Sequence, residues 1–204
     1  MNRVRVTTGA RIHVGFLNLS LAHNRLYGGI GVGLDEPRTV VTAAPADGID
    51  CDHPVARGYV ARAADRLGVS GATVTVDSAL PRHAGLGSGT QLALAVLTAV
   101  GRAHGREPDV RGLAPALGRG GRSGVGVATF EGGGVVVDAG HPAEQYTPDP
   151  PADGAWTVPD VAVRRSIPAS WRFLVGVPDT DRGRSGGARD ASIRAVGEPP
   201  DPGA

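Results

Sequence analysis

The sequence predicts an α+β domain in which strands and helices are mixed along the chain rather than strictly alternating. Three observations support this fold class. Val4–Thr8 alternates in character, as a strand with one exposed face does. Val55–Leu67 places its apolar residues at helical spacing, and Gly68 then favours a helix end. Gly89–His104 is apolar on most sides and predicts a buried helix.

The other elements of the first half are weaker signals. Arg11–Leu19 either continues the first strand or forms a second one. A glycine-rich segment, Tyr27–Leu34, precedes an expected strand at Thr39–Ala44. Ala72–Val76 predicts a further strand, and Val110–Leu117 a short helix.

The second half is predicted to be less regular. Ala128–Phe130 and Gly134–Asp138 suggest a hairpin around the intervening Glu-Gly-Gly turn. Residues 141–160 are rich in Pro and Asp and indicate a surface connection. Trp171–Val177 predicts a late buried strand, and apolar periodicity is lost after Pro178.

The composition excludes several classes of protein. The 204 residues suffice for a well-filled domain, and 41% hydrophobic residues support a globular core. A formal net charge of +1 gives no signal for nucleic acid or a membrane surface, and no apolar run approaches the roughly 20 residues of a membrane span. Cys51 is the only cysteine, and the six histidines lack metal-ligand spacing, so no internal disulfide or zinc site is expected. We expect a cytoplasmic protein.

The most informative stretch is the glycine-rich run from Pro81 to Thr90, which leads directly into the buried helix. Glycines let a backbone approach a phosphate closely, and the free amides and dipole of a helix N-terminus favour an anion. The alternative is a loop whose hydroxyl merely caps the helix. The spacing is not that of a dinucleotide fingerprint. The candidate phosphate-binding residues are Gly85, Leu86, Gly87, Ser88, Gly89 and Thr90.

The chain contains no lysine, so every cationic contact to a phosphate must come from arginine, and lysine-dependent phosphate loops and Schiff-base chemistry are excluded.

Pro81–Ser88 resembles the phosphate loop of the GHMP kinase superfamily, and its continuation Gly89-Thr90-Gln91 is similar to one branch, β-ribofuranosylaminobenzene 5'-phosphate synthase. Three further segments support this resemblance: residues 10–16 with 28–37, residues 117–138, and Trp171–Pro178. It covers residues 3–181. The resemblance implies a GHMP-kinase-like N-terminal domain, residues 1–140, with a mixed or antiparallel sheet and helices on one side.

The resemblance also implies a second, ferredoxin-like half. Residues 141–181 would form a connection and the start of that half, which would be largely missing. Residues 182–204 resemble the family only faintly and suggest a disordered or out-of-frame tail from a truncation or frameshift. Strands left without their partner half would expose apolar surface and favour aggregation or a homodimer.

The activity implied by the resemblance is transfer of ribose 5-phosphate from phosphoribosyl pyrophosphate to 4-aminobenzoate or 4-hydroxybenzoate, with release of CO₂ and pyrophosphate, as in methanopterin-type cofactor biosynthesis. Mg²⁺ is the expected cofactor, with Ser88 as its contact. GHMP-type kinase activity with ATP is the first alternative. It is disfavoured because Gly126 stands where the kinases carry an aspartate that handles the attacking hydroxyl. The second alternative is an inactive remnant that binds phosphates or a partner.

The remaining site candidates follow from the same motifs. Arg119 and Arg122 flank a glycine pair beside Ser123, as a clamp for phosphate or carboxylate or as a solvated turn. Arg11 and His13 are two residues apart and would share one face of a strand. The candidate catalytic residues are Arg11, His13, Arg122 and Ser123, and the candidate substrate-binding residues are Asn18, Gly28, Gly29 and Arg119. Asn18 stands where the family tends to have an aspartate.

Overall fold

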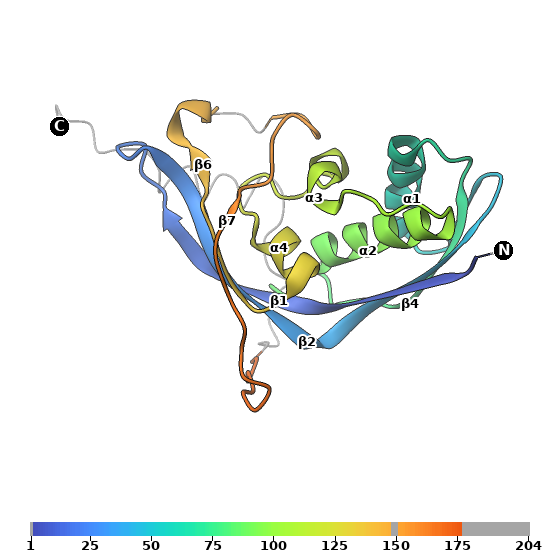
Figure 1. The fold of residues 1–204 in the computed structure, drawn as a ribbon, viewed down its shortest axis with the longest axis horizontal. Helices are drawn as coiled ribbons and strands as arrows, with labels where there is room; N and C mark the ends of the chain where they lie inside the picture. Colours follow the sequence, from blue (N-terminus) through green and yellow to red (C-terminus); the bar gives the residue numbers. More distant parts are fainter. Residues whose placement is uncertain (1, 148–150, 177–204) are drawn as a thin grey trace.

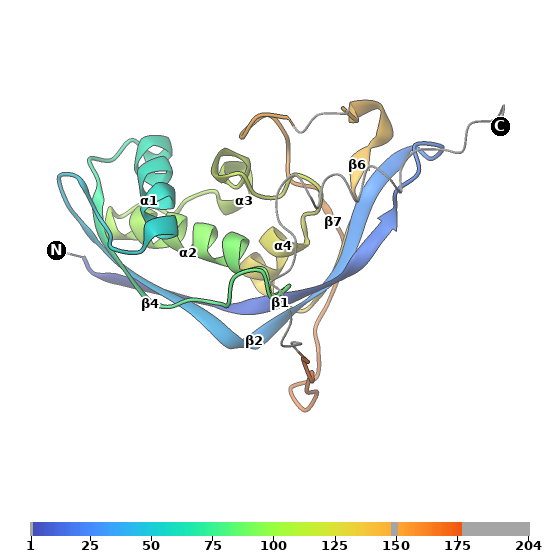
Figure 2. The same ribbon diagram turned by 180° about the vertical axis from the view of Figure 1, so that it is seen from behind.

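The computed structural model describes residues 2–147 and 151–176, and in this part of the chain one mixed sheet carries helices on a single face (Figures 1 and 2). The sheet has seven strands in the order β3-β4-β2-β5-β7, with β1 and β6 also paired to β2. All pairs are antiparallel except β3 with β4. The predicted fold class, a mixed sheet with helices on one side, is confirmed.

Two long strands organise the sheet. β1 (Val4–Asn18) and β2 (Arg25–Pro45) form an antiparallel hairpin, so Arg11–Leu19 largely continues the first strand rather than starting a second. The glycine-rich segment Tyr27–Leu34 and the predicted strand Thr39–Ala44 both lie within β2. Its glycines allow close packing: a Cβ at Gly31 would collide with the side chain of Val125 on the helix above it. The glycine-rich half of β2 is therefore the place where a helix approaches the sheet most closely.

The helical layer follows the sequence signals closely in its first half. α1 (Pro54–Leu67) begins where the His53 side chain accepts a hydrogen bond from the Ala56 amide, and it ends at Gly68, whose φ is +61°. α2 (Ser88–Ala103) lies between α1 and the sheet. Its leucines and valines are among the largest fully buried side chains, so this helix forms the centre of the core.

The shorter elements complete the layers. The predicted helix near Val110 is a single α-helical turn, α3 (Val110–Leu113), followed by a 3₁₀ turn, η1 (Pro115–Leu117). The others are β3 (Ile49–Asp50), β4 (Ala72–Ser78), β6 (His141–Pro142) and the 3₁₀ turn η2 (Ala143–Gln145).

The predicted hairpin around residues 131–133 is wrong. Its first strand is instead the last turn of a helix, α4 (Val125–Gly132), and only β5 (Val135–Asp138) is a strand. α4 is short and packs on both the sheet and α2, so most of its residues are buried and it shows no amphipathic period for sequence reasoning to detect. Glycines with positive φ, Gly133 and Gly134, end the helix where a hairpin turn was expected.

The predicted buried strand at Trp171–Val177 is also wrong over its described part, residues 171–176. Leu174 is fully exposed and Trp171 is 63% exposed, and neither lies in a strand. The position beside β5 is taken by β7 (Val161–Arg165), which pairs with it antiparallel. Val177 and the predicted tail, 182–204, lie outside the described residues.

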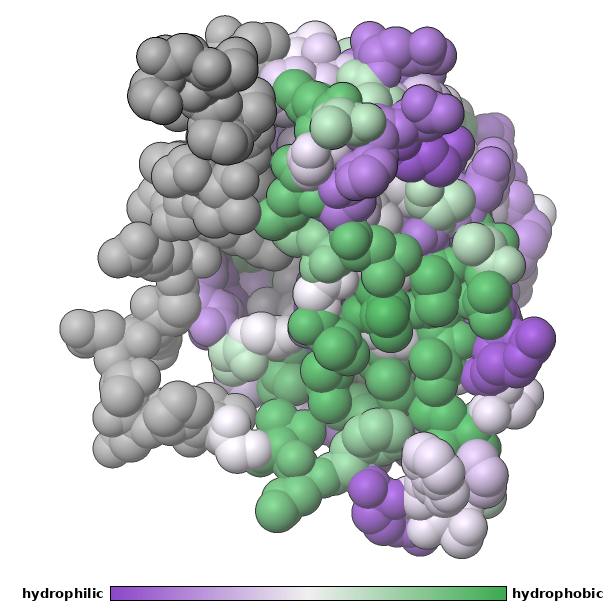
Figure 3. Space-filling view, turned by 90° about the vertical axis from the view of Figure 1, so that its left-hand side faces the viewer, coloured by the Kyte–Doolittle hydropathy of each residue, from purple (hydrophilic) through white to green (hydrophobic). Residues whose placement is uncertain are grey.

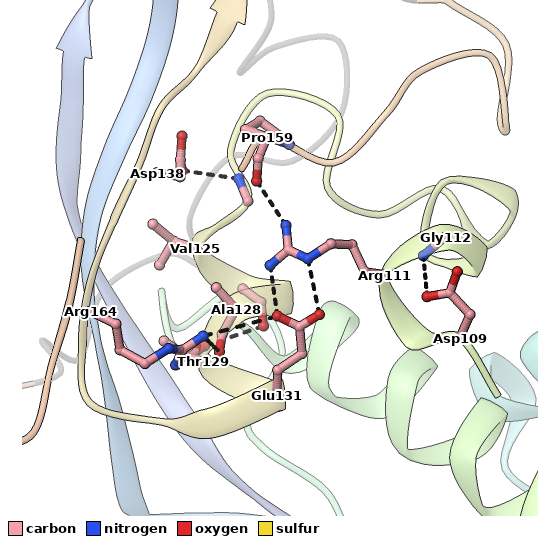
Figure 4. A network of polar contacts seen from close by, with 12 residues as sticks. Asp109, Arg111, Gly112, Val125, Ala128, Thr129, Glu131, Asp138, Pro159 and Arg164 are labelled. Carbon is pink, nitrogen blue, oxygen red and sulfur yellow. Dashed lines mark hydrogen bonds and ion pairs between the residues drawn. The ribbon is translucent and has the colours of Figure 1, made fainter. Parts of the chain in front are cut away.

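Arginine side chains hold β7 and α3 against α4 (Figure 4). Arg111 makes two hydrogen bonds to the Glu131 carboxylate, at 3.0 and 2.6 Å, and one to the Pro159 carbonyl at 2.8 Å. Arg164 on β7 donates to the carbonyl of Ala128 at 2.8 Å and to that of Gly133 at 2.6 Å. The Gly133 carbonyl directly follows α4, in the region where a helix leaves its carbonyls unpaired.

Hydrophobic side chains gather on the face seen in Figure 3, which views the molecule from the end of the β1–β2 hairpin. The exposed large hydrophobic residues include Val14 and Leu17 on β1 and Val163 on β7. No helix in the described residues is long and apolar enough to cross a membrane.

Candidate functional site

One cavity of about 980 Å³ collects most of the predicted catalytic residues. It is bounded by β1, the N-terminal turn of α2, the segment from Gly118 to Ser123, and residues 141–147 and 151–157. The predicted site residues that line it are Arg11, His13, Thr90, Arg119, Arg122 and Ser123. These residues are as many as 112 positions apart in the sequence, so the fold brings them together.

The predicted phosphate-binding loop is held in place by a buried leucine and by backbone hydrogen bonds. Leu86 is buried with Ala10 and Leu80 in a small hydrophobic cluster, and its carbonyl accepts the Arg11 amide at 3.0 Å. Gly87 has a φ of +78°, and its carbonyl accepts the amide of Thr90 as α2 begins. Leu86 therefore anchors the loop, while its glycines stay at the surface, where an anion would approach the helix N-terminus.

Two arginines flank this loop. The Arg11 guanidinium donates to the Gly85 carbonyl at 3.1 Å, and a Cβ at Gly87 would lie 2.8 Å from its Cγ. On the other side, a Cβ at Gly89 would lie 3.1 Å from Nη1 of Arg119. The absence of side chains at these glycines therefore gives the guanidinium groups direct access to the loop.

Aromatic residues hold Arg119 in place. Its guanidinium lies 5.3 Å from the ring centroid of Tyr59, and it donates a hydrogen bond to the Tyr59 hydroxyl. Its backbone carbonyl accepts the indole N–H of Trp156 at 3.0 Å. Arg119 is therefore a fixed cation beside the loop rather than the solvated turn residue that sequence reasoning left open.

Another part of the cavity lining is aromatic. The Phe16 and Tyr27 ring centroids are 5.6 Å apart, and those of Tyr27 and His141 are 6.5 Å apart at nearly a right angle. Tyr27 has a φ of +64°, which is uncommon for a residue with a side chain. Burial lowers the pKa of His141 below its usual value, and its hydrogen bond with the Gly121 carbonyl partly opposes that shift.

His13 and Ser123 form the floor of the cavity, and beneath them lies a functional candidate that sequence reasoning missed. Asp138, at the end of β5, is fully buried. Its Oδ2 accepts the Ser123 hydroxyl at 2.6 Å and the Gly124 amide at 3.0 Å (the latter drawn in Figure 4). His13 Nε2 lies 3.2 Å from Ser123 Oγ. The available signal was an aspartate directly after the apolar run of β5, which would have identified a carboxylate in the interior.

Several predicted residues lie outside the cavity wall. Asn18 donates to the carbonyls of Ser20 and Arg25, so it stabilises the turn between β1 and β2. Gly28 and Gly29 lie behind the wall, where a Cβ at Gly29 would meet His13 and Ser123. Ser88 and the loop residues Gly85, Leu86, Gly87 and Gly89 adjoin the cavity through Thr90 and the two arginines.

The side chains available as ligands determine how the expected Mg²⁺ could bind. No group of three His, Cys, Asp or Glu side chains in residues 2–147 and 151–176 could hold a metal ion. The oxygen donors at the start of α2 are the hydroxyls of Ser88 and Thr90. Such a set fits Mg²⁺ only in its common mode, bound mainly by substrate phosphates and water with one or two protein oxygens.

Comparisons with known proteins agree with this geometry. The family described as "GHMP kinases N terminal domain" matches residues 55–134. Among solved structures, Streptococcus pneumoniae phosphomevalonate kinase superposes with a TM-score of 0.54 at 13% identity, covering 71% of this chain and 50% of that one. Methanococcus jannaschii mevalonate kinase gives 0.52 at 13% identity, covering 67% and 53%. Residues 55–134 therefore match a GHMP kinase N-terminal domain, and the fold is shared with these kinases.

Sequence similarity is higher to one group of enzymes. The chain is 36% identical over 196 residues to beta-ribofuranosylphenol 5'-phosphate synthase of Methanothermobacter thermautotrophicus, covering 89% of this chain. It is 33% identical over 180 residues to the synthase of that name from Archaeoglobus fulgidus, covering 86%. The chain spans 60% and 58% of the lengths of these curated relatives. By sequence, the chain is therefore a homologue of the beta-ribofuranosylphenol 5'-phosphate synthases.

Proposed function

We propose that the protein transfers ribose 5-phosphate from phosphoribosyl pyrophosphate to a para-substituted benzoate, releasing CO₂ and pyrophosphate. One observation carries the proposal: a single cavity is lined both by residues at an arginine-flanked, glycine-rich loop and by aromatic side chains. Each substrate suits one of these two kinds of lining, since phosphoribosyl pyrophosphate is a polyanion and the benzoate contains a planar ring.

The loop side suits the diphosphate of the donor. Pyrophosphate leaves with two negative charges or more, so its departure needs donors and cations already in place. The amides at the start of α2 and the guanidiniums of Arg11 and Arg119 supply both. Mg²⁺, where bound through Ser88 or Thr90, would supply further charge neutralisation.

The aromatic side suits the acceptor. Phe16 and Tyr27 present ring faces and edges against which a benzoate ring can stack, and Arg122 on the same cavity can pair with its carboxylate. The names of the relatives contain phenol, which is what 4-hydroxybenzoate becomes when it loses its carboxylate. 4-Aminobenzoate would give an aniline instead. We therefore propose 4-hydroxybenzoate as the acceptor.

The proposed reaction balances without an external oxidant or reductant. The C1–O bond of the sugar breaks, and its electron pair leaves with pyrophosphate. The ring carbon that bears the carboxylate forms a bond to C1 of the sugar. The carboxylate then departs as CO₂, and the electrons of its bond return to the ring and restore aromaticity. The protein contributes by holding both substrates close together in one orientation.

Kinase activity with ATP is the competing proposal. Gly126, in the position of the kinase aspartate, lies on α4 against the phosphate loop, where its Cβ would be 3.1 Å from Cγ2 of Thr90. A larger side chain there would have to displace Thr90, which favours the transferase over the kinase.

The test is product analysis with the full chain and Mg²⁺. Phosphoribosyl pyrophosphate and 4-hydroxybenzoate labelled in the carboxylate should give labelled CO₂ and one pyrophosphate per CO₂. The same assay with 4-aminobenzoate identifies the acceptor, and ATP with a panel of alcohols tests the kinase. Formation of ADP without CO₂ release would replace the proposal. Ligand-dependent thermal stabilisation without any turnover would favour a binding remnant.

A further inference from the structure

The buried carboxylate of Asp138 has no role in the proposed reaction as written, and its surroundings indicate one. Burying a charged carboxylate is costly unless hydrogen bonds compensate. Asp138 accepts three: from the Ser123 hydroxyl at 2.6 Å, the Gly124 amide at 3.0 Å and the Gly140 amide at 3.0 Å. Two of these donors are backbone amides, so only the hydroxyl connects the carboxylate to the cavity.

The direction of the hydrogen bonds follows from the single proton of Ser123. That proton points to Asp138, because the Ser123 hydroxyl donates to the carboxylate oxygen Oδ2. Ser123 Oγ can then only accept in its other contacts, the Val125 amide at 3.2 Å and His13 Nε2 at 3.2 Å. Nε2 of His13 must therefore carry a proton, and the chain of donation runs from His13 through Ser123 to Asp138.

Gly29 on β2 leaves room for these three groups because it has no side chain. A Cβ at Gly29 would lie 2.8 Å from His13 Nε2, 2.9 Å from Ser123 Oγ and 3.2 Å from Asp138 Oδ2. Any side chain on this residue of β2 would push apart all three members of the chain at once. The backbone of β2 thus leaves a gap for the hydrogen-bonded chain to pass from β1 to β5.

We infer that Asp138 is a positioning residue for His13, acting through Ser123. The carboxylate orients the Ser123 hydroxyl, and the hydroxyl oxygen in turn holds His13 with its proton on Nε2. His13 is thereby fixed on the cavity wall, where its ring meets Phe16 edge-on at 5.2 Å. Only the kinetic readout below rests on the proposed function.

The first test is nitrogen-15 NMR of the histidine rings in the full chain, with the His13 signal assigned by a His13→Gln variant. We expect a hydrogen-bonded Nε2 proton on His13. Ser123→Ala should leave Asp138 its two amide donors and the fold intact, but the Nε2 proton should exchange rapidly with water. Gly29→Ala should have the same effect. Gly58→Ala is the matched control, because a Cβ there meets no atom within 4 Å.

Two results would overturn the inference. One is a His13 with its proton on Nδ1 and none on Nε2. The other is an Nε2 proton signal that is the same in Ser123→Ala as in the unmodified chain. If Gly29→Ala fails to fold, Ser123→Ala alone decides the question.

The second readout separates positioning from a purely structural role. With phosphoribosyl pyrophosphate and 4-hydroxybenzoate, Ser123→Ala should lower kcat by roughly tenfold or more and change each KM by less than about twofold. A rise in KM at unchanged kcat would contradict positioning of a catalytic histidine. If the unmodified chain shows no turnover, the proposed function fails, and the NMR result still decides the role of Asp138.

Discussion

The loop side and the floor of the cavity are built in different ways. On the loop side, ten consecutive residues from Pro81 to Thr90 shape the backbone, and two arginines flank it. The floor has no such continuous segment: His13, Ser123 and Asp138 come from β1, the loop before α4 and β5. The loop side depends on surface charge and backbone shape, whereas the floor depends on buried hydrogen bonds. Loss of a loop arginine should therefore affect mainly ligand affinity, whereas loss of the buried carboxylate should affect mainly stability.

Removal of the buried carboxylate should have the largest effect. Asp138→Ala leaves the Gly124 and Gly140 amides and the Ser123 hydroxyl without their acceptor. We expect the free energy of unfolding to fall by about 3–5 kcal/mol, since each unsatisfied buried donor costs about 1–3 kcal/mol. Urea denaturation measures this. Asp65→Ala, at an exposed carboxylate, is the control, and an equal loss in both variants would contradict the account.

Loss of a loop arginine should weaken anion binding without a comparable loss of stability. Arg119→Ala removes a cation beside the loop, and charge-assisted hydrogen bonds contribute about 1.5–3 kcal/mol. We expect the affinity for pyrophosphate with Mg²⁺ to fall by roughly 10–100-fold in calorimetric titration. Arg102→Ala, at the far end of α2, removes a side chain that pairs with exposed Glu107, and it should leave the affinity unchanged. Equal affinities for both variants would remove Arg119 from the site.

Loss of an aromatic side chain from the cavity should weaken benzoate binding and leave pyrophosphate binding unchanged. Tyr27→Ala removes a ring that lies between Phe16 and His141, and aromatic contacts contribute about 0.5–1.5 kcal/mol. The affinity for 4-hydroxybenzoate should fall by about 2–10-fold, while pyrophosphate binding stays within error. Arg119→Ala is the reciprocal control. A Tyr27 variant that lost pyrophosphate and kept the benzoate would reverse the assignment of the two sides.

The smallest effect should be a pH dependence from His141. Burial lowers its pKa in the folded state, so protonation favours the unfolded chain. Its contribution to stability is present above the ordinary pKa of 6.5 and is lost as the pH falls below that value toward the lowered one. Urea midpoints at pH 8 and pH 5.5 should differ less in His141→Asn than in the unmodified chain. The same reduction in His23→Asn, at an exposed histidine, would assign the effect elsewhere.

This contrast between local and distant residues also explains what the sequence could predict. The loop, α1, α2 and the strand and helix character of the first half follow from short segments, because glycine spacing, capping and apolar period are local signals. α4 did not follow, since a buried two-turn helix has no polar face. The apolar composition of Trp171–Val177 predicted a buried strand, but Trp171 and Leu174 are exposed, and the strand that pairs with β5 is β7, which contains two arginines.

The site shows the same division. The cluster of Arg11, His13, Thr90, Arg119, Arg122 and Ser123 was predicted as separate motifs, and the structure places these side chains around one cavity. Asp138 was missed because two of its three partners, Gly124 and Ser123, are 14 and 15 residues away. Asn18 was selected by its alignment with a family aspartate, but its hydrogen bonds close a turn.

The central claim is that one cavity holds a diphosphate and an aromatic acid at the same time. Calorimetric titration of pyrophosphate with Mg²⁺ into the full chain, first alone and then saturated with 4-hydroxybenzoate, tests it most directly. The account predicts binding in both titrations, with equal or higher affinity in the second. Pyrophosphate that fails to bind, or that binds only in the absence of the benzoate, would contradict it.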